Sequence, residues 1–435
     1  MTAVVGILNK RGVAIAADSA VTRSRLRDEK ITKNGNKMLR LSNCVPISVM
    51  ITGSANFLTT PWDIVIRRYR QQRGDIRHKS VEECVDDVFN YIASNNIFWE
   101  HEWIESWIEY ELEDIIKTVH KEIPEDVRSL SKRRPKTYLQ HFTSNLNKLE
   151  KGWLKNGIAP QFEGYSSERF HEYAHGAIDN LFENHLDSQD ELDDDNDCAE
   201  YSLILPIKER IESALMSYLT SKRKGGNRTQ LIFAGFGEED EYPSLIAAEV
   251  VGGFDNRVNY HISPENIVKI NDKRPAAICP FAQSDVADSI LSGVHKAYIA
   301  RIKKEVKDSY GKIKSSGFNG RGDDAFDAKF FIMLRQVEVE DLLDKFNVDF
   351  IQRKVNKRSA WEKTLKDYDL QSMASLAHNL INLTGFHRIL TFKQEGVGGP
   401  VDLAIISKAE GFTWLSRKSW YHHKDVNGQY GKFGV

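Results

Sequence analysis

Two apolar runs at the start of the chain constrain its fold more than any other feature. Residues 3–8 and 13–17 are rich in valine, isoleucine and alanine, and the polar stretch Asn9 to Gly12 separates them. A short polar turn with a glycine between two such runs is typical of a β-hairpin. Removal of Met1 would leave the amine and the hydroxyl of Thr2 together at the end of the first strand. A threonine hydroxyl that its own amine deprotonates is an activated nucleophile, so the hairpin is also a candidate reactive site.

The rest of the chain alternates between strand-like and helix-like segments. Apolar residues recur at helical spacing from Ala55 onward, and the helical pattern continues to about residue 224. The aromatic stripe at 98–107 is interpreted as the packed face of a core helix. Strands at both ends of a chain with helices between them predict an α+β fold. The expected strands outside the hairpin are 37–41, 46–53, 230–237, 244–251, 276–282, 398–406 and 412–415. A polar turn-rich segment is expected at 30–36, and a further helix is expected at 370–383.

Composition narrows the classes of function. Charged residues make up 28% of the 435 residues and the formal net charge is −2, which gives no reason to expect nucleic acid as a partner. No stretch approaches the length of a membrane span. The four cysteines are far apart and form no CxxC pair, so they are interpreted as thiols of a cytoplasmic protein without a metal site. No cofactor is expected.

Several short blocks occur along the chain in a fixed order. They are Thr2, Gly12, 16–19, Thr22, Lys37 and 51–55, followed by 232–236, 281–284 and 398–402. This order resembles that of proteasome β subunits and of the related bacterial proteasome-like peptidases, which are N-terminal nucleophile (Ntn) hydrolases. The resemblance implies an αββα four-layer Ntn-hydrolase sandwich, here with two large helical insertions that the family does not usually carry.

The resemblance also divides the chain into five segments. Residues 1–75 would form the first part of the Ntn core, 229–302 the second part and 369–435 the C-terminal part. The helical insertion would be 76–228, and the second insertion would be 303–368.

Five residues take catalytic roles by resemblance. Thr2 would attack the peptide carbonyl with its own amine as the base, and Lys37 would lower the pKa of that amine by like-charge repulsion. Asp18 would pair with Lys37 and orient it. The backbone N–H of Gly53 would stabilise the oxyanion, and Ser284 matches the active-site serine of the family.

Substrate contacts follow from the same comparison. The backbones of Thr22 and Ala55 would hold an extended substrate as an added strand, and Val21 and Ile51 would form a pocket for an apolar side chain. Two points stay open in the sequence. Lys33 is a rival for the role of Lys37, and Gln394 or Glu395 stands where the family has an aspartate before its glycine pair.

A separate motif offers a different chemistry. His171, Glu172 and His175 spell HExxH within an expected helix, which is the pattern of a zinc peptidase with the glutamate as general base. His185 or Glu183 is a candidate third ligand. An exposed helix without metal is the more frequent origin of such a match.

The sequence as a whole predicts a cytoplasmic threonine-type endopeptidase that cleaves peptides or unfolded proteins. By resemblance, it would form a homo-oligomeric ring or partial ring, and an ATP-dependent unfoldase is a candidate partner whose need the sequence leaves open. The alternatives are a zinc metallopeptidase that uses the HExxH motif and a catalytically silent Ntn-fold assembly subunit. No nucleic acid and no membrane are expected as partners. The insertions would cap a ring, recruit the unfoldase or prevent ring closure, and the sequence does not choose among these roles.

Overall fold

The computed structural model describes most of the chain as antiparallel sheets and helices, which confirms the expected α+β class. The described residues are 3–25, 28–32, 35–187, 201–222, 228–282, 285–292, 360–390 and 399–418, with four further residues between 301 and 308. Within these ranges, residues 21–25 and 28–32 are described through the backbone alone. The chain divides into two compact units. The first unit comprises residues 1–36, 241–243 and 269–435, and the second comprises 37–240 and 244–268.

The first unit is built on a five-stranded sheet in the order β13-β1-β2-β14-β15, so the first strand of the chain lies in the interior of the sheet. Every neighbouring pair in the sheet is antiparallel. Its strands are β1 (Ala3–Asn9), β2 (Gly12–Ala17), β13 (Ala276–Ala282), β14 (Asp402–Ser407) and β15 (Gly411–Ser416). Its helices include α9 (Asp285–Ser292) and α13 (Leu370–Leu390), and a separate hairpin consists of β3 (Val21–Arg25) and β4 (Asp28–Thr32).

The predicted opening hairpin is confirmed. Asn9 pairs with Gly12 across β1 and β2, which leaves a two-residue turn at Lys10 and Arg11. The Asn9 side-chain oxygen accepts the Arg11 N–H at 2.9 Å, a local bond of the kind that favours asparagine in turns. The β3–β4 hairpin was not predicted, because its charged residues show no apolar alternation; strand β4 ends at Thr32, inside the segment that was expected to be a turn.

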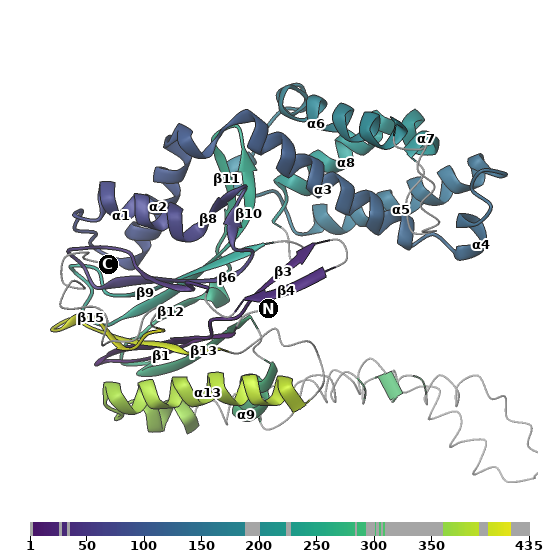
Figure 1. Cartoon of the computed structure of the whole chain (residues 1–435). Coiled ribbons are helices and arrows are strands. Elements are labelled where there is room, and N and C mark those ends of the chain that lie inside the picture. Colours follow the sequence, from purple (N-terminus) through teal and green to yellow (C-terminus); the bar gives the residue numbers. More distant parts are fainter. Residues whose placement is uncertain are drawn as a thin grey trace, which may run out of the picture. The chain divides into compact units, whose positions relative to one another are not determined.

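One face of the five-stranded sheet packs against α13, as Figure 1 shows for β1 and β13. Alternate residues of β1 form this face, as the period of a strand requires, and they meet small apolar residues of the helix. The core residues include Val5, Ile7, Ala374, Ala377 and Leu380. Residues of the opposite face, including Val4, Leu8, Val13 and Ile15, are buried as well.

The second unit contains a six-stranded sheet in the order β11-β10-β9-β6-β5, with β12 paired to β10. Its strands are β5 (Met38–Arg40), β6 (Ile47–Gly53), β9 (Thr229–Gly235), β10 (Ser244–Phe254), β11 (Arg257–His261) and β12 (Ile267–Lys269). A short hairpin of β7 (Asn56–Phe57) and β8 (Thr60–Pro61) follows β6. This hairpin corrects the expected helix start at Ala55, because the first helix begins only at Trp62.

Helices occupy the chain between the two halves of this sheet, in agreement with the predicted helical region. They are α1 (Trp62–Arg73), α2 (Val81–Ser94), α3 (His101–Lys121), α4 (Glu125–Arg128), α5 (Pro135–Lys155), α6 (Ser167–Asp187), α7 (Tyr201–Ile204) and α8 (Lys208–Thr220). Short 3-10 turns lie at Asn96–Phe98, Pro160–Phe162, Leu205–Ile207 and Pro264–Asn266.

A single hydrophobic core joins the helices to the six-stranded sheet. It includes Val49 and Phe233 from the sheet together with Ile66, Phe89 and Ile108 from three helices. The expected aromatic stripe is part of this core, since Trp99 and Trp107 are both buried. The helical region and the second sheet therefore form one packed body. The five-segment domain division stays a prediction.

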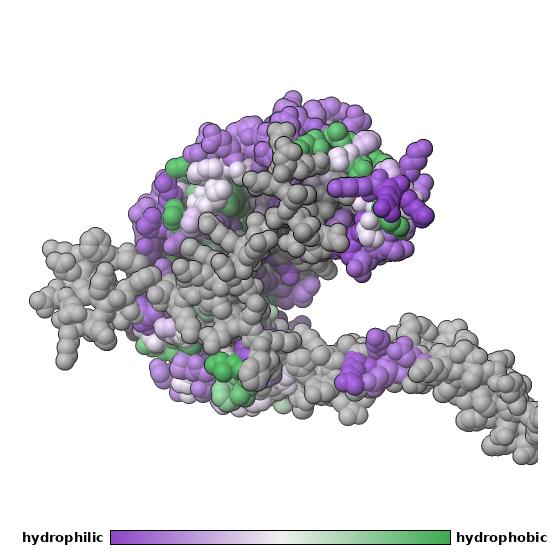
Figure 2. Space-filling view, turned by 45° about the vertical axis from the view of Figure 1, so that its right-hand side comes forward, coloured by the Kyte–Doolittle hydropathy of each residue, from purple (hydrophilic) through white to green (hydrophobic). Residues whose placement is uncertain are grey.

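The described surface is largely polar on the face that Figure 2 shows, with smaller hydrophobic areas between hydrophilic ones. Among the described helices, none combines the length and the apolar composition that a membrane span requires.

Candidate functional site

The start of β1 is fixed by a buried carboxylate in the first unit. Asp18 follows β2 and is 1% exposed. Its Oδ1 accepts the Ala3 N–H at 2.9 Å, and its Oδ2 accepts the Ala20 N–H at 3.3 Å. The Asp18 N–H in turn donates to the Ala3 carbonyl at 3.1 Å. Because hydrogen bonds to an ionised acceptor are stronger than neutral ones, Asp18 holds the backbone of the residue directly after Thr2.

A buried charge pair that the sequence did not predict lies at the same end of the sheet. Lys418 follows β15, and its Nζ lies 2.8 Å from Asp402 Oδ2, with both side chains 4% exposed. The Lys418 ammonium also contacts Ser19 Oγ at 3.4 Å, one residue after Asp18. The β14–β15 register brings the two residues together, because Leu403 lies opposite Ser416, and spacing in the sequence gave no signal for it.

Three predicted site residues come together in the second unit. The Ile51 N–H donates to the Lys37 carbonyl at 2.8 Å, which extends the β5–β6 pairing and sets Lys37 opposite Ile51. Directly opposed residues of an antiparallel pair carry their side chains on the same face. Gly53 belongs to that face too, because it lies two residues beyond Ile51. Lys37 is 5% exposed and Ile51 is 7% exposed, so the predicted lysine and the predicted pocket residue are both buried.

The direction of the Gly53 N–H follows from the strand ladder. Amide groups alternate between the two neighbours of a strand. The Ile51 N–H points to β5, and the Ser54 N–H points to β9, where it donates to the Arg228 carbonyl at 2.9 Å. The Gly53 N–H therefore points to the β5 side of β6.

Only glycine fits at position 53. Its φ is +84°, in the left-handed region that side chains disfavour. A Cβ built there would lie 2.1 Å from the Arg228 carbonyl oxygen, which is backbone and cannot swing away. The close approach of β6 and β9 therefore requires a glycine where β6 ends.

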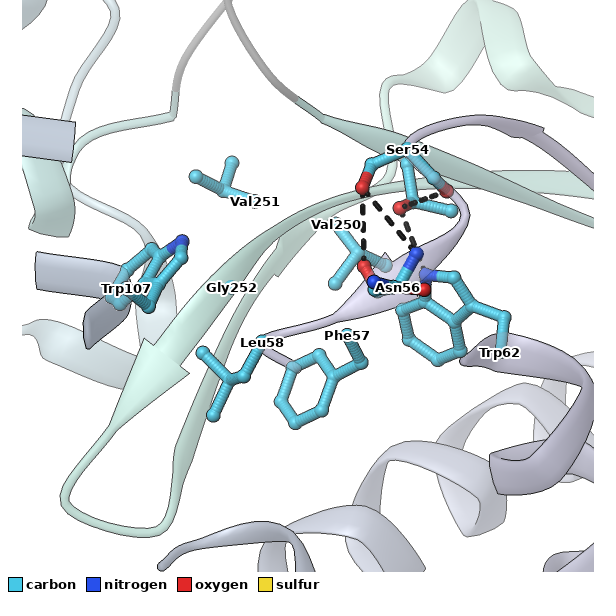
Figure 3. A pocket seen from close by; sticks show the side chains of 10 residues that line it. Ser54, Asn56, Phe57, Leu58, Trp62, Trp107, Val250, Val251 and Gly252 are labelled. Atoms are coloured by element: carbon cyan, nitrogen blue, oxygen red, sulfur yellow. Dashed lines mark hydrogen bonds between the residues drawn. The ribbon is translucent and has the colours of Figure 1, made fainter. Parts of the chain in front are cut away.

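The residues after Gly53 are fixed by hydrogen bonds to a helix and a strand. The Thr229 hydroxyl donates to the Ser54 carbonyl at 2.9 Å and accepts the Trp62 indole N–H at 2.8 Å. The Ala55 carbonyl accepts the Trp62 N–H at 2.9 Å. The same segment lines a small cavity of about 20 Å³, and Figure 3 shows the side chains of Asn56, Phe57, Trp62 and Trp107 around it. That volume holds about one water molecule, so it is no pocket for a substrate side chain.

The remaining predicted residues are placed only in part. Thr2, Ser284, Lys33, Gln394 and Glu395 lie outside the described residues. Val21 and Thr22 form the start of β3, and their side chains are likewise outside the description. Asp18 and Lys37 belong to different units, whose relative positions are not determined, so their ion pair stays a prediction.

The HExxH residues lie on α6, as predicted, but they do not form a metal cluster with a third ligand. His171 Nδ1 lies 2.8 Å from Glu212 Oε1, and His175 Nδ1 donates to the His171 carbonyl at 2.8 Å. His185 stacks on Tyr201 with ring centroids 4.0 Å apart, and burial lowers the pKa of its imidazole. Across the described ranges, no group of three or more histidine, cysteine, aspartate or glutamate side chains is arranged to hold a metal ion.

Comparison with known proteins adds no assignment, because neither a protein-family model nor a curated protein matches the sequence. The proposals below therefore depend on the resemblance of the sequence blocks and on the geometry of each unit.

Proposed function

We propose that the protein is a threonine-type peptidase of the Ntn-hydrolase class, with Thr2 as nucleophile once Met1 has been removed. The observation that carries this proposal is the way the start of β1 is held. The strand lies in the interior of a sheet, and a buried carboxylate binds the N–H of Ala3, the residue next to Thr2. A nucleophile must be fixed in position to gain the rate advantage of proximity, and this arrangement fixes its neighbour.

The proposed mechanism begins with attack of Thr2 Oγ on a peptide carbonyl. An α-amino group ordinarily has a pKa of about 8, which suits the Thr2 amine as a base at neutral pH. It takes the hydroxyl proton and then passes it to the leaving amine. The resulting ester is hydrolysed by a water molecule that the same amine deprotonates. Lys37 supplies a positive charge for this site, and its burial on the strand face of Ile51 and Gly53 supports that role.

Gly53 is the proposed oxyanion donor. Its N–H points to the β5 side of β6, where it would stabilise negative charge that develops on the carbonyl oxygen, and the ammonium of Lys37 is a second proposed source of positive charge. The Ala55 carbonyl is already bonded to Trp62, so Ala55 would contact an extended substrate through its N–H.

We also propose the four-layer Ntn-hydrolase sandwich as the fold. Each unit has an antiparallel sheet with helices packed on one face, α13 in the first unit and helices such as α2 in the second. The opposite faces are apolar and buried too, as Ile15 in the first unit and Ile232 in the second illustrate. This is the burial that two inner sheet faces of a sandwich require.

The first experiment determines the N-terminal residue of the purified full-length protein by intact mass and N-terminal sequencing. The second measures cleavage of an unfolded protein and of a mixed peptide library by the wild type, Thr2→Ala and Thr2→Ser. We expect Thr2 at the N-terminus, no cleavage by Thr2→Ala, partial activity of Thr2→Ser, and no effect of chelators. Retention of Met1 in an active protein would refute the threonine mechanism. Cleavage that survives Thr2→Ala but is lost with a chelator would support the zinc alternative instead.

The proposal includes the assembly and the location implied by the resemblance. We expect a ring or partial ring of identical subunits in the cytoplasm, which would confine the active sites, and an ATP-dependent unfoldase that delivers substrate. Light scattering coupled to size-exclusion chromatography tests the oligomer. A monomer with full Thr2-dependent activity would exclude the ring as a requirement.

A further inference from the structure

Lys418 occupies an unusual environment at the end of the first unit's sheet. Its ammonium is enclosed by three acceptors: Asp402 Oδ2 at 2.8 Å, Ser19 Oγ at 3.4 Å and the carbonyl oxygen of Gly35. Its own backbone N–H donates to Asp402 Oδ1 at 2.9 Å. A lysine ammonium has three hydrogens, so these three acceptors match its full donor capacity.

The acceptors belong to segments that are far apart in the sequence. Ser19 directly follows Asp18, Gly35 lies two residues before Lys37, and Asp402 begins β14. Further bonds close the cluster: the Ser19 hydroxyl donates to the Pro400 carbonyl at 2.7 Å, and the Gly35 N–H donates to the Ser19 carbonyl at 3.0 Å. Lys418 therefore connects the end of the hairpin that carries Asp18 to the C-terminal strands.

A purely stabilising role explains this arrangement poorly. Two charges that leave water pay a desolvation penalty, and replacement of a buried pair by neutral residues of similar size is often neutral for stability. The ammonium instead contributes directed hydrogen bonds to a hydroxyl and a carbonyl, which a neutral residue would not supply. These bonds fix Ser19, which lies between Asp18 and Ala20 in the chain. Asp18 accepts the N–H groups of both Ala3 and Ala20.

We propose that Lys418 is a positioning residue for the N-terminal nucleophile. With its charge balanced by Asp402, its ammonium locks the Asp18–Ala20 turn through Ser19, and Asp18 then holds the strand start that carries Thr2. This inference rests on the proposed function. The segment after β15 would then help to position the start of the opening hairpin, although Lys418 itself touches no reacting atom.

The deciding variant removes both charges of the pair. Lys418→Met combined with Asp402→Asn leaves no unpaired buried charge, and the asparagine oxygen still accepts the N–H of residue 418. We expect this double variant to fold with a melting temperature close to that of the wild type. Its kcat for peptide cleavage should fall about tenfold or more with KM nearly unchanged, because a small displacement of a nucleophile is costly. The single variant Lys418→Arg, with Asp402 retained, should have a higher kcat than the double variant, because arginine still supplies a cation and hydrogen-bond donors.

Two further measurements separate local positioning from global effects. Hydrogen exchange at the amides of Ala3 and Ala20 should accelerate about tenfold in the double variant, while amides of β6 in the second unit stay unchanged. Arg417→Met is the matched control, since Arg417 is the exposed neighbour that lies over the Trp414 ring, and it should behave as wild type in every assay.

The outcomes distinguish this inference from the proposed function. If the wild type shows no Thr2-dependent cleavage, the proposed function fails, and the exchange rates still decide whether Lys418 orders the strand start. If the wild type cleaves and the double variant keeps its kcat and its exchange rates, the pair is structural only and the positioning role is overturned.

Discussion

Substitution of Gly53 by alanine tests the close approach on which the proposed oxyanion donor depends. Gly53 has a φ of +84°, and a Cβ there would lie 2.1 Å from the Arg228 carbonyl oxygen. Gly157 is a matched control in the same unit. Its φ is +78°, and nothing lies within 4 Å of the corresponding Cβ. The two substitutions therefore share the backbone penalty and differ in the steric contact.

The expected magnitudes follow from these two terms. A left-handed conformation costs a residue with a side chain about 1–2 kcal/mol. At position 53 the strands must also separate by about 1 Å to restore a normal contact, and overpacking of this kind costs about 1–3 kcal/mol more. The free energy of unfolding should thus fall by about 2–5 kcal/mol in Gly53→Ala and by about 1–2 kcal/mol in Gly157→Ala.

Denaturant unfolding followed by circular dichroism and tryptophan fluorescence measures both values. The peptidase assay on the same samples should show a larger loss of kcat in Gly53→Ala than in Gly157→Ala, because only the former displaces the proposed oxyanion donor. Equal losses of stability in the two variants would refute the argument that β6 and β9 approach too closely for a Cβ.

Three further predictions concern other parts of the chain. Asp18→Ala should lower the free energy of unfolding by about 1–3 kcal/mol, because it removes the acceptor of the buried Ala3 N–H. Thermal denaturation measures this loss. The control is Asp272→Ala, which removes the exposed partner of Lys10 and should cause no measurable change. Burial tends to raise the pKa of Asp87, but hydrogen bonds from Arg73, Tyr69 and His78 outweigh it and hold the pKa below its ordinary value of 3.8. A carboxylate with a depressed folded-state pKa contributes stability above the unfolded pKa and loses it as the pH falls through the folded value. Urea midpoints of the wild type and Asp87→Asn should therefore differ from pH 7 down to about pH 4 and approach each other only at lower pH, as the carboxylate of the folded protein is protonated. Burial raises the pKa of the Cys84 thiol to about 12, whereas Cys44 is exposed. Brief alkylation of the native protein at pH 8 should therefore modify Cys44 and leave Cys84 intact, which a peptide map measures. Modification of Cys84 at the same rate as Cys44 would contradict its burial.

Local patterns accounted for the parts of the fold that depend on neighbouring residues. The opening hairpin could be predicted because two apolar runs flank a turn that Asn9 stabilises through its own side chain. The end of β6 at Gly53 was also visible, because an apolar strand runs directly into a glycine. The β7–β8 hairpin was missed, since a run of only two residues per strand is too short to show a period.

The candidate site residues were proposed from the resemblance, and the structure brings three of them together on one strand pair. Lys37, Ile51 and Gly53 share a face because Lys37 lies opposite Ile51 and Gly53 lies two residues further along the strand. The Lys418–Asp402 pair needed the register of β14 and β15, which shifts between Leu403 and Ala404. A shift of one residue reverses the face of every side chain that follows, so spacing alone does not give such a contact.

The sequence by itself determined the opening hairpin and the α+β class, which arise from local turn chemistry and from the period of strands and helices. The residues on which the proposed chemistry depends came from the resemblance to the Ntn hydrolases. The tertiary structure decided which groups are buried together: Asp18 with the Ala3 N–H, and Lys418 with Asp402 and Ser19. Residues more than 380 positions apart in the chain meet there only because the C-terminal strands complete the sheet that the first strand begins.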